Sequence, residues 1–172
     1  MPQISGVWRK AGENRVLKSF NLKRLNDQAA QVTVEFDLPD VRSQFRAVYT
    51  VLGSGDVIVR NDFITDEPNL PEIPRFGVKL RLPKGFERME YYGRGPQENY
   101  CDRNTAALVG VYKSTVSEQY FPYISPQENG NKTDVRWVAF MNDDGVGVMA
   151  VGMPLLSMSA LHYTIEDLTQ ES

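Results

Sequence analysis

The stretch Val32-Thr33-Val34-Glu35-Phe36-Asp37-Leu38 decides the fold class. Its apolar side chains alternate with polar ones, and in a β-strand such alternation gives one face packed in a core and one face in water. The same pattern returns in residues 44–51, where Val48 falls on the mostly polar face, and in residues 76–82. Turn-forming residues at 53–56 and 142–145 separate β-rich segments and are typical of hairpin connections.

The whole chain follows this strand-and-turn pattern. About ten strands of similar spacing predict an all-β antiparallel sandwich rather than a fold of alternating strands and helices. One short helix is expected near residues 164–170, where Thr164 and Asp167 form a loose capping box. A length of 172 residues favours a single domain.

The composition excludes several functional classes. The formal net charge is −3 and no stretch concentrates Lys and Arg, so a nucleic-acid surface is not expected. No apolar run approaches the roughly 18–20 residues that span a bilayer, so no membrane segment is predicted. A single cysteine, Cys101, rules out an internal disulfide. No signal peptide is visible, and the sequence leaves the cytoplasm and the periplasm equally open.

Two polar and aromatic segments, residues 91–103 and residues 120–137, are the places where function is expected. Both combine aromatic rings with Glu, Asn and Arg, a combination that suits the apolar and hydroxyl faces of a sugar. The residues predicted to line such a carbohydrate site are Arg75, Glu98, Asn99, Glu128, Asn129, Arg136 and Trp137. The structural alternative, which composition favours over the sugar site, is that these side chains tie long loops to their own backbone.

Other chemistry has less support. A glycosidase needs two carboxyl groups at a set separation, and Glu98 and Glu128 stand in two similar Gln-Glu-Asn contexts that suggest hydrogen-bonding roles. His162 is the only histidine and is expected to be a structural hydrogen-bonding residue. Cys101 stands beside Asp102, whose carboxylate would disfavour a thiolate. No metal-ligand spacing, phosphate loop or nucleophile elbow occurs.

The two segments resemble landmarks of a known family. Tyr92-Gly93-Arg94-Gly95-Pro96-Gln97-Glu98-Asn99-Tyr100, followed by Asp102-Arg103, is similar to a signature in the C-terminal domain of glycoside hydrolase family 2 β-galactosidases. Pro126-Gln127-Glu128-Asn129-Gly130 and then Arg136-Trp137 resemble that domain's next landmark. Trp8-Arg9-Lys10-Ala11-Gly12 is similar to the start of the same domain, so the resemblance covers nearly the whole chain.

The resemblance implies an antiparallel β-supersandwich of the galactose-mutarotase type. It implies that residues 1–172 are one domain, shortened at both ends relative to the family's domain, and that the partners are the remaining domains of a β-galactosidase. Full enzymes of the family cleave terminal β-D-galactosyl residues with retention, using two glutamates on a (β/α)₈ barrel domain with magnesium and sodium nearby. Neither glutamate has a counterpart here, and no cofactor or metal is expected in this chain.

Three functions follow as hypotheses. The first is a non-catalytic β-galactosidase domain that supports the catalytic domain and helps to shape a galactoside site, and that is inactive in isolation. The second is a stand-alone carbohydrate-binding module. The third is an aldose 1-epimerase, for which His162 with Glu98 or Glu128 is the only acid–base pairing available.

Overall fold

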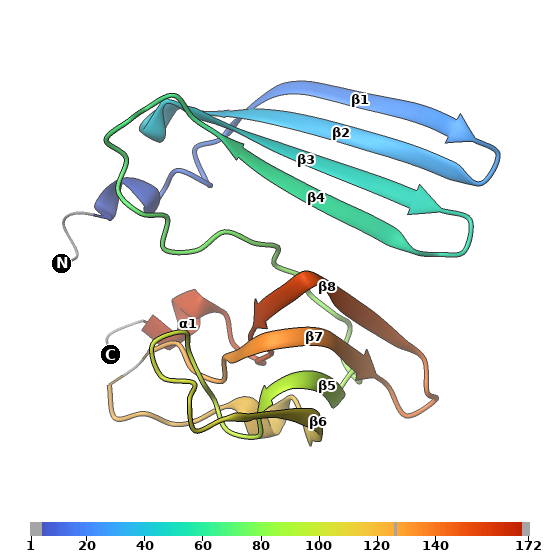
Figure 1. Cartoon of the computed structure of the whole chain (residues 1–172), viewed down its shortest axis with the longest axis vertical. Coiled ribbons are helices and arrows are strands. Elements are labelled where there is room, and N and C mark those ends of the chain that lie inside the picture. The colour runs from blue at the N-terminus through green and yellow to red at the C-terminus, as the bar shows by residue number, and fades with distance from the viewer. Residues whose placement is uncertain (1–4, 126, 170–172) are drawn as a thin grey trace. The chain divides into compact units, whose positions relative to one another are not determined.

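The computed structural model describes residues 5–125 and 127–169. The chain divides into two compact units, Met1–Lys79 and Leu80–Ser172, and each contains one four-stranded antiparallel sheet (Figure 1). The predicted all-β antiparallel class is therefore confirmed, whereas the assignment of residues 1–172 to a single domain stays a prediction. No helix in the described part of the chain is long and apolar enough to cross a membrane.

The first unit is a four-stranded meander in the order β1-β2-β3-β4. Its strands are β1 (Val16–Asn26), β2 (Ala29–Leu38), β3 (Ser43–Leu52) and β4 (Val57–Ile64), and its 3₁₀ turns are η1 (Gly6–Trp8) and η2 (Pro39–Val41). The predicted hairpin at residues 53–56 joins β3 to β4, with Gly55 at φ +94°. A φ in this range strains any residue with a Cβ, which explains the glycine there.

The alternation in sequence gives this sheet two different faces. In the register, Phe36 of β2 lies beside Phe45 of β3, and Thr33 lies beside Val48. Phe45 and Val48 therefore face opposite ways, as the sequence predicted. A small core of Ala11, Leu38 and Val41 packs at one end of the sheet, together with Trp8, Phe45, Phe63 and Leu70.

The second unit has the strand order β6-β5-β7-β8. Its elements are β5 (Arg88–Gly95), β6 (Leu108–Thr115), η3 (Ser117–Gln119), β7 (Lys132–Met141), β8 (Gly147–Met158) and α1 (Ile165–Thr169). Its core is formed by Met89, Tyr91, Val135 and Val138, which are almost fully buried. The expected hairpin at residues 142–145 connects β7 to β8.

The strand predicted at residues 76–82 is wrong, and the described residues form eight strands rather than ten. The segment is extended but makes no ladder with a neighbouring strand, and Phe76, Val78 and Leu80 are exposed. Alternation selects an extended backbone, but a strand also needs a partner whose N–H and C=O groups pair with its own.

The C-terminal helix is confirmed as α1. The backbone N–H of Thr164 donates to Asp167 Oδ2 at 2.8 Å, and the backbone N–H of Asp167 donates to Thr164 Oγ1 at 3.2 Å. This reciprocal pair is a capping box with Asp in the place of Glu. Gln170, the last residue of the predicted helix, lies outside the described residues.

Candidate functional site

The first motif leaves the sheet at the end of β5, where two backbones approach closely. A Cβ on Gly93 would lie 2.8 Å from Val135 Cγ2 and 3.0 Å from Val135 Cα on β7. Only a glycine leaves room for this contact, which brings the loop after β5 against the start of β7.

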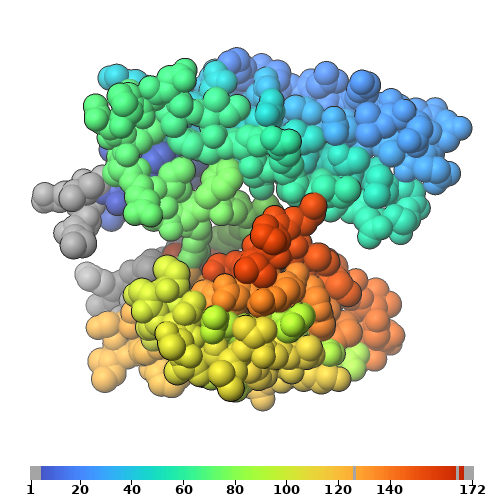
Figure 2. Space-filling model, viewed as in Figure 1, coloured from blue at the N-terminus to red at the C-terminus, as the bar shows by residue number. Residues whose placement is uncertain are grey.

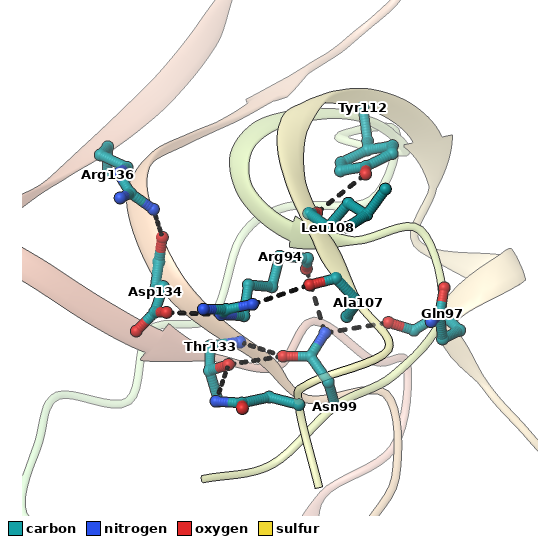
Figure 3. Close-up of polar contacts among 10 residues, drawn as sticks. Arg94, Gln97, Asn99, Ala107, Leu108, Tyr112, Thr133, Asp134 and Arg136 are labelled. Atoms are coloured by element: carbon teal, nitrogen blue, oxygen red, sulfur yellow. Dashed lines mark hydrogen bonds and ion pairs between the residues drawn. The ribbon is translucent and has the colours of Figure 1, made fainter.

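Asn99 is the centre of the contacts made by that loop (Figure 3). Its side chain is 1% exposed, and its Nδ2 donates to the carbonyl oxygens of Arg94 and Gln97 at 3.0 Å each. Its Oδ1 accepts the backbone N–H of Thr133 at 2.9 Å and the Thr133 hydroxyl at 2.6 Å. The amide therefore satisfies backbone groups of its own loop and of β7, as the structural alternative describes.

An ion pair lies beside Asn99. Arg94 Nε donates to Asp134 Oδ2 at 2.6 Å, and Arg94 Nη1 donates to the carbonyl oxygen of Ala107 at 2.9 Å (Figure 3). Asp134 has a left-handed φ of +51° and marks an irregular start of β7, where the register with β8 shifts. Arg94 thus connects β5, the segment before β6, and β7.

Glu98 joins the two motifs to each other. Its Oε1 accepts hydrogen bonds from the Tyr123 hydroxyl and from Arg103 Nη2, the latter at 3.0 Å. Its Oε2 accepts the backbone N–H of Gly130 at 2.9 Å. Partial burial raises the pKa of Glu98, but the hydrogen bonds from Tyr123, Gly130 and Arg103 outweigh it and hold the pKa below its ordinary value.

Lys132 is a buried cation near this carboxylate. Lys132 is only 2% exposed, and its Nζ donates to the carbonyl oxygen of Gly130 at 3.3 Å. Burial lowers the pKa of Lys132 to about 8, and the charge of Glu98 opposes that shift. The sequence did not single out this residue, because nothing in residues 130–134 distinguishes a buried lysine from one in solvent.

The second motif uses its polar groups in a similar way. Asn129 is 1% exposed, its Oδ1 accepts the backbone N–H of Phe121 at 3.1 Å, and its Nδ2 donates to the carbonyl oxygen of Gln127 at 3.2 Å. The Tyr100 hydroxyl donates to the carbonyl oxygen of Glu128 at 3.3 Å. Residues 96–104 are thus connected to residues 120–125 and 127–131, and we call these two loops together the loop clamp.

Arg136 and Trp137 lie on the sheet rather than in the loop clamp. Trp137 pairs in register with Tyr92, and the Arg136 guanidinium lies 5.2 Å from the centre of the Tyr92 ring. Val135 and Val138 are buried in the core on the other face of the sheet. Arg136 and Trp137, which lie between them in the chain, therefore both face away from the core. The irregular register of β7 accounts for this grouping.

The remaining predicted site residues are dispersed. Arg75 is an exposed residue of the first unit, whereas the other six belong to the second. His162 contacts Glu87 Oε2 at 3.0 Å and Ser117 Oγ at 3.2 Å, a different carboxylate from those proposed for an epimerase. Cys101 is free and exposed. Among the described residues, no group of three or more His, Cys, Asp or Glu side chains is placed to hold a metal ion.

These features define an antiparallel β domain whose two conspicuous polar motifs brace each other through buried amides and one carboxylate. A family model described as the β-galactosidase small chain matches residues 2–172. The chain therefore belongs to the β-galactosidase small chain family.

Three similar proteins are called β-galactosidases. The chain is 36% identical over 158 residues to the β-galactosidase of Priestia megaterium, covering 92% of this chain and 15% of that protein. It is 32% identical over 173 residues to the one of Halalkalibacterium halodurans, covering 98% and 17%. It is 33% identical over 159 residues to the one of Lactobacillus delbrueckii subsp. bulgaricus, covering 91% and 15%. The chain thus spans 15–17% of the length of these relatives.

Proposed function

We propose that this chain is a non-catalytic domain of a β-galactosidase, and that it supports the part of the enzyme that cleaves the glycosidic bond. The domain would support the catalytic part without contributing a reacting group. Any magnesium or sodium would bind elsewhere in the enzyme. Its partners would be the remaining domains, which in the relatives account for most of the polypeptide.

The hydrogen bonding of the Glu98 carboxylate is the observation that supports this proposal most directly. The carboxylate accepts hydrogen bonds from Tyr123, Arg103 and Gly130, and its side chain is only 16% exposed. A general acid needs a raised pKa and a proton to donate, whereas these donors lower the pKa of Glu98. A nucleophile needs free lone pairs that face the substrate. Both requirements support a structural role for Glu98 over a catalytic one.

Two assays test the proposal. The purified chain, made in a host without its own β-galactosidase, is expected not to hydrolyse a chromogenic β-galactoside. A chimera of the Priestia megaterium enzyme, in which this chain replaces the matching segment, is expected to hydrolyse it. An enzyme with that segment deleted is expected to be inactive. Turnover by the isolated chain, or full activity of the deletion enzyme, would overturn the proposal.

Carbohydrate binding is a second candidate, favoured by the grouping of Tyr92, Arg136 and Trp137 on one face of the sheet. Aromatic rings and a guanidinium suit the apolar and hydroxyl faces of a sugar. Asn99 and Asn129 would then position the loops, since their amides already bond to backbone. Titration of a Trp8→Phe chain, in which Trp137 is the single tryptophan, with galactose or lactose is expected to change its fluorescence. The same chain with Arg136→Ala is expected to show no change. No change at tens of millimolar sugar, which would place any dissociation constant above that concentration, would exclude it.

A further inference from the structure

Asn129-Gly130 is the one place in the chain where an asparagine is followed by glycine. In such a pair the backbone nitrogen of the glycine can attack the side-chain carbonyl carbon of the asparagine, because glycine has no Cβ to hinder the approach. A C–N bond forms, ammonia leaves, and a cyclic succinimide remains. Water then opens the ring to aspartate or to isoaspartate. The pair is therefore chemically reactive unless the fold restrains it.

The closed loop clamp restrains both reacting groups. The Asn129 amide is fixed at both of its polar atoms, because Oδ1 accepts the backbone N–H of Phe121 at 3.1 Å and Nδ2 donates to the carbonyl oxygen of Gln127 at 3.2 Å. The attacking nitrogen is engaged as well, because the N–H of Gly130 donates to Glu98 Oε2 at 2.9 Å. Rotation of the amide onto that nitrogen breaks these hydrogen bonds, so the closed loop clamp opposes the reaction.

The products of the reaction do not fit the place that the amide leaves. An aspartate has no N–H, so a negatively charged oxygen would face the carbonyl oxygen of Gln127 where the Nδ2 donor now lies. An isoaspartate adds a backbone carbon between residues 129 and 130 and displaces the N–H that Glu98 accepts. The backbone has little room for that shift, because a Cβ on Gly130 would already lie 2.7 Å from the carbonyl oxygen of Gln119.

We propose that Asn129-Gly130 is a deamidation site that the closed loop clamp protects, and that deamidation prevents the loop clamp from closing again. The net reaction takes up one water and releases one ammonia, and the chain supplies both reacting groups. A reversible opening of the loops thereby becomes an irreversible change. The inference goes beyond the proposed function, since the contacts that carry it all lie within the second unit.

Peptide mapping by mass spectrometry measures the conversion of Asn129 to the acid during incubation of the chain at neutral pH. When loops open and close rapidly, a reaction of the open form proceeds in proportion to the population of that form. The folded chain is expected to react roughly a hundredfold more slowly than the chain unfolded in urea, a factor of about five for each of the three hydrogen bonds. Equal rates in the folded and the unfolded chain would overturn the inference.

Asp144→Asn provides the matched control, because it creates a second Asn-Gly pair in the turn between β7 and β8. No atom lies within 4 Å of the position that a Cβ on Gly145 would take. The N–H of Gly145 makes one turn hydrogen bond, to the carbonyl oxygen of Asn142 at 3.2 Å. The new pair is therefore expected to react in the folded chain within about fivefold of its rate in urea. Equal protection of the two pairs would mean that the loop clamp has no special part, and would overturn the inference.

Two variants loosen the loop clamp by different amounts. Glu98→Gln weakens the charge-assisted bond to Gly130 and is expected to speed deamidation of the folded chain about thirty-fold, a factor that corresponds to about 2 kcal/mol. Tyr100→Phe removes the bond to the carbonyl oxygen of Glu128 and is expected to speed it about fivefold. Glu72→Gln, at an exposed side chain, is expected to change nothing. Unchanged rates in both loosened variants, or a slower rate in Glu98→Gln, would overturn the inference.

The effect of the product is tested with Asn129→Asp in the Trp8→Phe chain. Its folded fraction relative to the unfolded one is expected to fall about tenfold or more, measured as a lower midpoint of urea unfolding. Asn142→Asp is the matched control, because the Asn142 oxygen accepts the N–H of Val146 at 2.9 Å and a carboxylate keeps that bond. Its midpoint is expected to stay unchanged. Equal midpoints for the two variants would contradict the claim that deamidation keeps the loop clamp open.

Discussion

Replacing Asn99 with alanine tests how the loop clamp is held. The change removes four hydrogen bonds, to Arg94, Gln97 and, twice, Thr133. A buried hydrogen bond contributes about 1 kcal/mol net, and each buried group that loses its partner costs about 1–3 kcal/mol. Asn99 is 1% exposed, so water cannot readily replace the amide. The expected loss in the free energy of unfolding is about 4 kcal/mol.

Urea denaturation in a Trp8→Phe background, where Trp137 of the second unit is the single tryptophan, measures this loss by fluorescence as a shift of the midpoint at constant m-value. Gln97→Ala is the control, because the exposed Gln97 side chain makes a single bond, to the carbonyl oxygen of Ala106 at 3.2 Å. Its expected loss is below about 1 kcal/mol. A loss of less than about 1 kcal/mol for Asn99→Ala would refute the reasoning that this amide braces the loops.

Three further predictions concern the same region. Glu98→Gln is expected to lower the free energy of unfolding by about 2 kcal/mol at pH 7, because charge-assisted hydrogen bonds are lost. The pKa of Glu98 in the folded chain lies below its ordinary value of 4.5. The stability difference between the two chains is therefore fully present above pH 4.5 and is lost as the pH falls through the lowered pKa. Burial lowers the pKa of Lys132 in the folded chain to about 8. Above that pH, the unfolded chain therefore binds more protons at this residue than the folded chain. The stability of the chain relative to Lys132→Met should therefore rise by about 2 kcal/mol between pH 8 and 9.5. Gly93→Ala should cost about 1–3 kcal/mol, because its Cβ would overlap Val135.

Chemical denaturation as a function of pH measures all three, with a control for each. Glu72→Gln and Lys23→Met make the same changes at exposed side chains and are the matched controls. Gly12→Ala places a Cβ where no atom lies within 4 Å and should be nearly neutral. A pH-independent difference for Glu98→Gln or Lys132→Met, or a neutral Gly93→Ala, would contradict the account of that residue.

The faces of the first sheet could be read from the sequence because alternation and register are both local. The pattern at residues 32–38 and 44–51 predicts which side chains share a face, and even Val48 lies where the pattern puts it. The same pattern failed at residues 76–82, because periodicity does not reveal whether another strand is present to pair with. Bounded by Pro74 and Pro83, that segment is extended but forms no ladder with another strand.

The sequence picked out the two polar motifs, but not the hydrogen bonds that join them. The two motifs lie in loops that contact each other, since Glu98 accepts the backbone N–H of Gly130 and the Asn131 side chain donates to the carbonyl oxygen of Asn99. The sequence could not show that Glu98 reaches Tyr123 and Gly130, since these contacts join residues 25 and 32 positions apart. The burial of Lys132 also depends on that meeting, and no local pattern signals it.

The central claim is that bond cleavage belongs to polypeptide outside this chain. Hydrolysis with retention passes through a covalent glycosyl-enzyme, which a 2-fluorinated galactosyl donor traps for mass spectrometry. In the Priestia megaterium chimera, the trapped sugar is expected on a peptide outside the 172 residues of this chain. A galactosyl adduct on any peptide of this chain, at Glu98 or Glu128 above all, would contradict the claim.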